Sequence, residues 1–120
     1  MSKPFTLHCI AWHAGAPLLL ELRSDAYQIG LLSASEVLPD ETDMQGRHAL
    51  ALGINGRCIG SARMTADGII DRVAVLPHEQ QEQIEAALIE ELKAYADENN
   101  LEVTLDFKPI IKTQSTAAAY

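Results

Sequence analysis

The sequence predicts an α/β (α+β) domain in which a mixed, mainly antiparallel sheet is flanked by helices, in the order β-α-β-β-β-α-β. Three observations lead to this fold class. Two turn signals near the centre join three apolar runs, helical apolar repeats lie on both sides of these runs, and short strand-like segments lie toward both ends. The chain of 120 residues is 48% hydrophobic, which is enough for one core, so residues 1–120 are expected to form a single domain.

The first two predicted elements are a strand and a helix. Residues 5–12 are mostly apolar and lie between Pro4 and Gly15, which is typical of a short strand. Apolar residues then recur with helical spacing from 16 to 29. Pro17 suits the first turn of a helix, because an N–H group at that position would have no partner within the helix.

An acidic segment follows this helix. Residues 33–46 contain Glu36, Asp40, Glu41 and Asp43, are interrupted by a proline and end on a glycine. This composition predicts a connecting loop with room for a short helix.

The centre of the chain carries the strongest structural signal. Two apolar runs, 48–54 and 57–64, are joined by Asn55-Gly56, a pair that is typical of a tight β-hairpin turn. A second turn at 66–68 leads into a third apolar run at 69–76. These segments predict an antiparallel meander of three strands.

A long helix and a last strand are expected after the meander. Residues 79–99 place apolar side chains near one helical face, at Ile84, Ala87, Leu88, Leu92 and Tyr95. Residues Leu101 to Phe107 alternate between apolar and polar types as in a strand. The tail from Lys108 shows only a weak helical signal, over 117–119.

Composition narrows the possible functions. The chain has 9 Lys+Arg against 17 Asp+Glu, a formal charge of -8, so nucleic acids and anionic membranes are not expected partners. Cys9 and Cys58 lie in apolar runs and are expected to pack as small hydrophobic residues rather than form a disulfide or a metal site. Since no long apolar segment or signal-like N terminus is found, the protein is expected to be cytoplasmic.

Three stretches of the predicted meander together carry a family resemblance. They read RHALAL over 47–52, CIGSARM over 58–64 and DGIIDRVAVLP over 67–77. In this order of elements they resemble the core of the small bacterial branch of the GNAT N-acyltransferases. The likeness covers the chain from about Leu18 to Leu105.

The resemblance implies where an acyl-CoA would lie. In the family, the strand resembling residues 71–76 lends backbone groups to the pantetheine arm, which here implies those of Val73 and Val75. The turn after that strand binds the pyrophosphate and usually reads Arg-Gly-x-Gly-x-Gly/Ala. Glycines let the backbone come close to the phosphates, while the arginine and the N–H groups of the helix N terminus favour their negative charge.

The corresponding turn of this chain lacks that chemistry. The positions that differ are Gln80 in place of the arginine, and Gln81, Gln83 and Glu85 in place of the glycines. Side chains then fill the space of the pyrophosphate in this turn, and the acids at 79, 82 and 85 repel phosphates. The same acids also have a purely structural interpretation, since early-helix acids stabilise the positive end of the helix dipole. The resemblance thus implies a vestigial acyl-CoA site, with no cofactor expected.

Asp71 is the one weak candidate for a catalytic base. Some family members place a carboxylate at this strand position to steer the substrate amine, and an exposed acid without a catalytic role is the competing interpretation. Nearby, Arg63 and Arg72 are expected to pair with loop acids such as Asp40 or Asp43. Surface pairs of this kind contribute on the order of 0–1 kcal/mol to stability.

The histidines and the C-terminal tyrosine predict no catalytic or metal site. The 4 histidines are scattered without paired spacing, at His8, His13, His48 and His78. Nothing after Lys108 resembles the family's downstream helix with its aromatic pair and acid tyrosine, so Tyr120 is not expected to act as a general acid.

Three functions compete on this basis. The leading hypothesis is a GNAT-like pseudo-enzyme that acts as a non-catalytic interaction or regulatory module and has lost acetyl-CoA binding. The alternative is an acyl-CoA-dependent N-acyltransferase that uses acetyl-CoA on an unknown amine. The third is a sensor that holds an uncharged small ligand in the cleft. Because a fold does not fix a function, the state of the site decides between them.

A homodimer is the expected assembly. In the family, two further strands cover the strand that resembles Leu101 to Phe107, and this chain is too short to supply them. An edge with unpaired N–H and C=O groups would result, and pairing with a second copy about a two-fold axis satisfies both chains.

Overall fold

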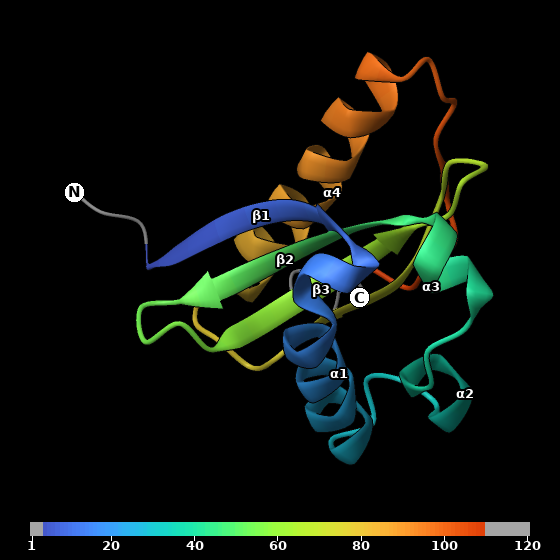
Figure 1. The fold of residues 1–120 in the computed structure, drawn as a ribbon. Helices are drawn as coiled ribbons and strands as arrows, with labels where there is room; N and C mark the ends of the chain where they lie inside the picture. The colour runs from blue at the N-terminus through green and yellow to red at the C-terminus, as the bar shows by residue number, and fades with distance from the viewer. Residues whose placement is uncertain (1–3, 110–120) are drawn as a thin grey trace, which may run out of the picture.

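A five-stranded sheet forms the centre of the protein, with helices on both of its faces (Figure 1). The structure is a computed structural model that describes residues 4–109. The elements, in chain order, are β1 (Phe5–Ala11), α1 (Trp12–Gln28), α2 (Ala34–Val37), α3 (Glu41–Gln45), β2 (Arg47–Gly53), β3 (Cys58–Met64), β4 (Ile69–Val75), α4 (Gln81–Glu98) and β5 (Thr104–Leu105).

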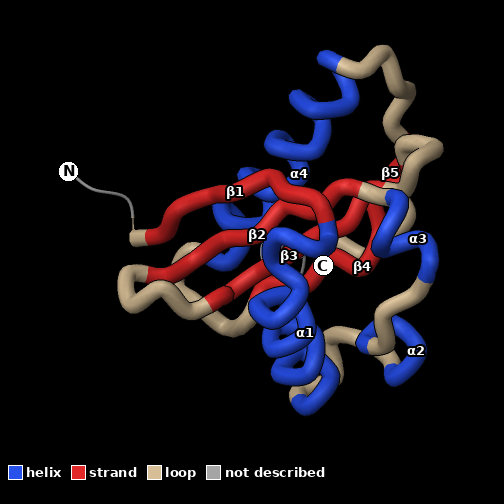
Figure 2. Tube along the Cα trace, in the orientation of Figure 1, coloured by secondary structure: helices blue, strands red, loops and turns tan. Residues whose placement is uncertain are grey.

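The strands lie in chain order across the sheet, from β1 at one edge to β5 at the other (Figure 2). β1 to β4 are antiparallel neighbours, and β5 is parallel to β4. This arrangement confirms the predicted fold class and element order, and the three strands of the meander lie within a residue of their predicted bounds. The two predicted turns place Gly56 at φ 81° and Gly68 at φ 91°, a backbone region that favours glycine.

The start of α1 differs from the prediction. The helix begins at Trp12, directly after β1, whereas the sequence placed its start at Ala16. Gly15 interrupts the helix with φ −148° and ψ 20°, so the glycine that was taken as a boundary is a kink inside the element. A side chain at Gly15 would collide with Ile10, so this kink also lets the helix pack closely against the end of β1.

The acidic segment contains two short helices where the sequence predicted a loop with room for one. Both begin with a reciprocal capping box, in which each end residue binds the backbone N–H group of the other. In α2 the pair is Ser33 and Glu36, and in α3 it is Asp40 and Asp43. The acids of this segment therefore fix its backbone.

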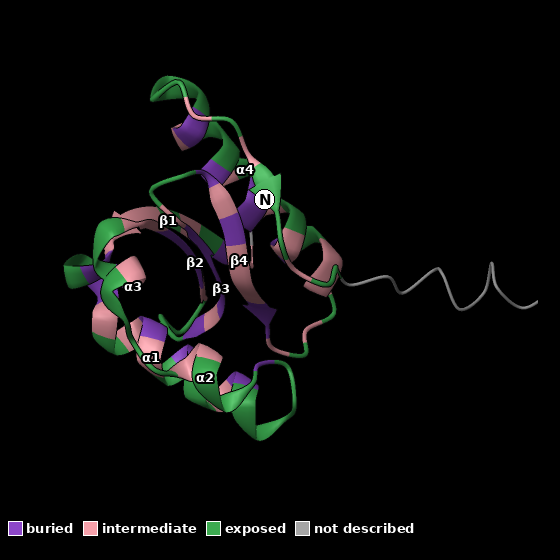
Figure 3. Cartoon of the chain, turned by 90° about the vertical axis from the view of Figure 1, so that its right-hand side faces the viewer, coloured by how far each residue is buried: buried purple, intermediate pink, exposed green. Residues whose placement is uncertain are grey.

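The core has two layers, one on each face of the sheet, and the buried residues lie between the sheet and the helices (Figure 3). α4 covers one face and buries Ile84, Leu88 and Leu92, as its apolar repeat predicted. α1 covers the other face and buries Leu19 and Leu22.

β4 carries a β-bulge at its centre. Ser61 pairs with Ala74 and Arg63 pairs with Asp71, so two residues of β4 lie opposite one residue of β3. One of these two, Arg72, has φ 48°, a strained value for a residue with a side chain. The bulge redirects the side chains of β4 at the place where the family's site would lie.

The prediction of a strand from Leu101 to Phe107 was wrong in its length. β5 consists of Thr104 and Leu105, which pair with the first two residues of β4. The N–H groups of Thr104 and Asp106 donate to the carbonyl oxygens of Gly68 and Ile70, at 3.0 and 2.8 Å. β5 therefore contacts only the beginning of β4.

The predicted alternation in this segment holds in part. Leu101, Val103 and Phe107 pack against the core on the α4 side, whereas Leu105 is 51% exposed. The predictions made for 117–119 and for Tyr120 lie outside the described residues.

Candidate functional site

The candidate cofactor site lies where β4 ends and α4 begins. The N–H group of Leu76 donates to the carbonyl oxygen of Ile59 on β3, at 2.9 Å. Because hydrogen-bonding direction alternates along a strand, the backbone groups of Val75 face away from β3. Val73, the other residue that the resemblance assigns to the pantetheine arm, belongs to the bulge of β4, and β5 reaches neither of the two.

The carbonyl oxygen of Val75 already accepts a hydrogen bond from a side chain of the protein. The Nε2 atom of Gln81 donates to the carbonyl oxygen of Val75, at 2.8 Å. Gln81 is the first residue of α4 and stands at the first glycine position of the family's turn. A glycine there would leave the carbonyl oxygen open to a ligand, whereas the glutamine amide closes it.

The N terminus of α4 is bound by its own turn. The backbone N–H groups of Gln80 and Gln81 donate to Nδ1 and the carbonyl oxygen of His78, at 3.0 and 3.1 Å. Gln80, the position of the family's arginine, makes no side-chain cap, and its Oε1 atom is buried without a hydrogen-bond partner in the described residues. The turn thus lacks the family's arginine, and two of the N–H groups at the start of the helix bind His78 instead of being open to a pyrophosphate.

The remaining two positions of the turn carry side chains where the family has glycines. Gln83 is exposed and Glu85 is half-buried on the first turns of α4. Glu82 lies in the first turn as well, where an acid stabilises the helix dipole and opposes a bound phosphate. The structure therefore brings all the predicted turn residues together at the helix N terminus.

The candidate base Asp71 is held by an arginine. Its Oδ1 and Oδ2 atoms accept from Nε and Nη2 of Arg63, both at 2.8 Å. Its side chain is 21% exposed, so it is not the freely exposed acid that the competing interpretation expected. Both oxygens of this carboxylate therefore take part in an ion pair with the guanidinium of Arg63.

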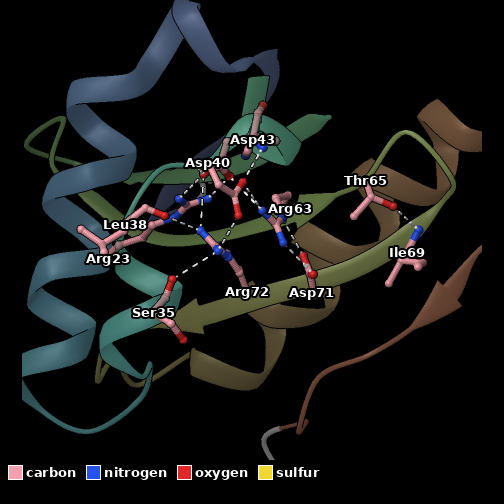
Figure 4. A network of polar contacts seen from close by, with 11 residues as sticks. Arg23, Ser35, Leu38, Asp40, Asp43, Arg63, Thr65, Ile69, Asp71 and Arg72 are labelled. Atoms are coloured by element: carbon pink, nitrogen blue, oxygen red, sulfur yellow. Dashed lines mark hydrogen bonds and ion pairs between the residues drawn. The ribbon is translucent and has the colours of Figure 1, made fainter. Parts of the chain in front are cut away.

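Asp43 forms the centre of a buried ion network (Figure 4). Its carboxylate accepts two hydrogen bonds from Arg23 on α1, at 2.9 and 2.7 Å. Arg63 and Arg72 also reach it, at 3.3 and 3.4 Å. The side chain of Asp43 is 0% exposed and that of Arg23 is 1% exposed.

The charges of this network set the pKa of Asp43. Burial alone raises that pKa, but the hydrogen bonds and charge of Arg23, the backbone N–H donated within the capping box, and the charge of Arg63 outweigh it. The pKa of Asp43 falls from 3.8 to about 2. The carboxylate is therefore ionised throughout the neutral range.

Arg72 extends the network to the loop that carries the short helices. Its Nη2 atom pairs with Asp40 at 3.0 Å, and its Nη1 atom donates to the carbonyl oxygen of Leu38 at 2.8 Å (Figure 4). A longer bond, at 3.3 Å, joins Nη2 to the carbonyl oxygen of Ser35. The bulge of β4 thus ties the segment from α2 to α3 onto the sheet.

The predicted pairing of Arg63 and Arg72 with Asp40 and Asp43 is confirmed, but its expected surface position is wrong for the pairs with Asp43, which is buried, whereas Asp40 is 44% exposed. The side chains of Arg63 and Arg72 are 7% and 9% exposed. Buried ion pairs behave differently from surface pairs, since removal of one partner leaves an uncompensated charge in a poorly solvated place.

Sequence reasoning missed Arg23 and the role of His48. Arg23 lies four residues after Leu19 within the apolar stripe of α1, which is a readable signal for a buried partner. His48 is fully buried, contacts the Trp12 ring at 5.3 Å between centroids and bonds the carbonyl oxygen of Asp43 through Nε2 at 2.9 Å. Burial lowers the pKa of His48, and the nearby positive charges add to this effect.

The other candidate residues are placed apart from one another. Cys9 and Cys58 are both free thiols, and burial raises the pKa of Cys58 to about 11. Within residues 4–109, no group of three or more His, Cys, Asp or Glu side chains could hold a metal ion. No helix in the same range has the length and apolar character needed to span a bilayer.

Comparisons with known proteins identify the fold. No family model matches the chain, and no curated protein matches it. Among solved structures, an aminoglycoside acetyltransferase from an uncultured soil metagenomic sample is 18% identical, with a TM-score of 0.66 over 100% of this chain and 89% of its own. An acetyltransferase of the GNAT family from Staphylococcus aureus is 13% identical, with a TM-score of 0.60 over 96% and 80%. An acyl-CoA N-acyltransferase from Pseudomonas aeruginosa is 19% identical, with a TM-score of 0.62 over 97% and 84%. The chain therefore has the fold of the GNAT N-acyltransferases.

Proposed function

We propose that this protein is a non-catalytic GNAT-fold module with an interaction or regulatory role, and that it does not hold acetyl-CoA. The observation that carries the proposal is the 2.8 Å hydrogen bond from the Gln81 side chain to the carbonyl oxygen of Val75. It fills, with the protein's own amide, the place where a glycine would leave room for the cofactor.

The state of Asp71 supports the same proposal. An acyl transfer to an amine needs a group that removes a proton from the attacking nitrogen. Asp71, the candidate that the sequence offered for that group, binds Arg63 through both carboxylate oxygens, and we infer a structural role for it.

We keep an acyl-CoA-dependent N-acyltransferase as the second candidate, because one feature of the scaffold favours it. β4 retains its bulge, and β5 pairs with Ile69 and Ile70 only, so the second half of β4 has no strand on its outer side in residues 4–109. A cofactor bound there would need phosphate contacts outside the turn at 80–85.

Titration calorimetry of the wild-type protein tests the first proposal. We expect no saturable heat with either CoA or acetyl-CoA at submillimolar concentration. Pantetheine serves as the matched control, because this part of the cofactor lacks the pyrophosphate that the turn repels. Saturable micromolar binding of acetyl-CoA would support the acyltransferase and remove the pseudo-enzyme proposal.

We further propose a homodimer joined by the segment from Leu101 to Phe107. The N–H groups of Thr104 and Asp106 point to β4, so those of Leu105 and its alternate neighbours point outward. The described residues pair nothing with this outer side of β5, which leaves an edge open to a second copy.

The outward N–H group of Leu105 provides a test of this dimer. We expect light scattering at tens of micromolar to show a dimer for the wild type and a monomer for Leu105→Pro, which removes an outward donor. Leu105→Val keeps the donor and is the matched control. A monomeric wild type contradicts the proposal, and a folded dimer that tolerates the proline places the interface elsewhere.

We also assign the protein to the cytoplasm. Its cysteines, Cys9 and Cys58, are both unpaired, which suits a reducing compartment.

A further inference from the structure

A cavity lies far along α4 from the cofactor turn, where β2 begins and β3 ends. Its volume is about 480 Å³, within the range of small-molecule sites. Met44, Met64, Tyr95 and Leu101 give it apolar walls, and Arg47 lines it as its charged residue. Tyr95 belongs to the last turns of α4, whereas the cofactor turn precedes the first turn of the same helix.

Arg47 forms no ion pair with any of the described residues. Arg23, Arg57, Arg63 and Arg72 each contact an aspartate, whereas no carboxylate within residues 4–109 lies within 4.0 Å of Arg47. Its only hydrogen bond there is a long one, from Nη2 to the carbonyl oxygen of Cys9 at 3.4 Å. Its Nε atom is buried and has no partner in these residues.

The position of this guanidinium is nevertheless well defined. Its carbon lies 4.8 Å from the centre of the Tyr95 ring, which is a cation–π contact. Arg47 also sits in the sheet, at the first residue of β2, opposite Met64 of β3 and Ala11 of β1. A fixed guanidinium with unused hydrogen-bond donors, at a cavity that has both apolar and polar walls, is a pre-organised anion site.

We propose that this cavity binds a small monocarboxylate with an apolar body. The carboxylate accepts hydrogen bonds from Arg47, and Thr65 lines the same cavity. The apolar body lies among Met44, Met64 and Leu101. This inference does not rest on the proposed loss of acetyl-CoA binding, because no residue of the turn at 80–85 lines the cavity.

The charge of the surroundings favours a carboxylate over a phosphate. Among residues 4–109, Arg47 is the only cationic residue that lines the cavity, so it balances one negative charge. Burial is the main cause that raises the pKa of the Cys9 thiol, and the charges of Glu91 and Glu98 on α4 raise it further, so these acids act on the place where Cys9 bonds Arg47. A dianionic phosphate would meet these acids without a second cation to offset them.

Benzoate is the probe for the test, followed by amide NMR of the isotope-labelled full chain. We expect saturable shifts at Gly46, Thr65 and Ala66, which line the cavity. Benzamide, which has the same shape without the charge, should bind on the order of tenfold more weakly, because hydrogen bonds to an ionised partner are stronger than those to a neutral one. Phenylphosphonate should also bind more weakly than benzoate.

Variants assign the effect to the cavity. Arg47→Met should weaken benzoate on the order of tenfold or more, and Arg47→Lys should restore part of the affinity. Arg57→Met is the matched control, since Arg57 is an exposed arginine that pairs with Asp25 away from the cavity, and it should leave binding unchanged. If Arg47→Met does not fold, Ala66→Leu tests the same site, because Ala66 is an exposed residue of the cavity wall.

Several results would overturn the proposal. These are no saturable shifts up to about 10 mM benzoate, equal affinity for benzamide, or shifts that map to the turn at 80–85. Unchanged binding by folded Arg47→Met, or by Ala66→Leu, would do the same. Tighter binding of phenylphosphonate would overturn the assignment to a monocarboxylate.

Discussion

Replacing Asp43 with alanine is expected to lower the free energy of unfolding by about 3–5 kcal/mol, since it removes one partner from a buried ion network. The change leaves Arg23 without its two short hydrogen bonds, and takes one partner each from Arg63 and Arg72. It also removes the capping box of α3. Urea denaturation, followed by circular dichroism, measures the loss.

Asp25→Ala is the matched control for this variant. Asp25 pairs with Arg57 at 2.7 Å, and the two side chains are 34% and 54% exposed, so the removal of Asp25 should cost less than about 1 kcal/mol. A loss for Asp43→Ala as small as that of the control would mean that the network does not hold the loop from α2 to α3 onto the sheet.

The pH dependence of stability provides a second view of the same residue. The folded-state pKa of Asp43, about 2, lies below its ordinary value of 3.8, so the unfolded chain binds its proton first as pH falls. Asp43 therefore contributes its full stabilisation above about pH 4 and loses it as pH falls through about 2. A shift of this size corresponds to about 2 kcal/mol, and Asp43→Asn should lack that component.

Restoring the turn is expected to restore affinity for CoA. The variant combines Gln80→Arg, Gln81→Gly, Gln83→Gly and Glu85→Gly. It removes the amide that occupies the carbonyl oxygen of Val75, opens the backbone to phosphates and adds the positive charge. We expect calorimetry to change from no measurable binding to a dissociation constant below about 1 mM.

A triple variant that retains Gln81 separates the two causes. With Val75 still occupied, it should gain less affinity than the quadruple variant, even though the charges are the same. Glycines destabilise α4 by up to about 1 kcal/mol each, so circular dichroism must show that each variant folds. A folded quadruple variant that gains nothing would mean that the groove for the pantetheine arm is lost as well.

The central meander was predictable because its signals are local. Asn55-Gly56 and Gly68 set the turns, and each apolar run between them is long enough to define a strand. The family resemblance rested on the same stretch, and the fold comparison supports it. α4 was predictable for a similar reason, since its apolar stripe persists over the whole helix.

The features that were missed depend on contacts distant in sequence. β5 is short because its pairing reaches only Ile69 and Ile70, which no local pattern reveals. The early start of α1 depends on Trp12, which is buried in the layer under that helix and contacts His48. Neither the alternation of residue types nor helix propensity contains that information.

The ion network was predictable in its partners but not in its burial. Opposite charges on the acidic loop and on Arg63 and Arg72 suggested the pairs, and the structure places them under α1 with Arg23 as the added member. Burial of charged residues requires that every partner be in place, and this depends on the packing of several elements at once. The residues at 80–85, by contrast, lie at the start of α4 shortly after β4, as their place in the sequence predicts, and their role as a vestigial cofactor site stays a prediction.

The most direct test of the central claim is a site-resolved titration of the wild-type protein with acetyl-CoA, measured by amide NMR. Calorimetry reports binding anywhere on the molecule, whereas the amide signals of Val73, Val75 and Gln81 report on the proposed closed site alone. We expect these signals to stay unchanged up to about 1 mM acetyl-CoA. Saturable shifts of the same amides at lower concentration would show that the cofactor enters the turn, and would contradict the account.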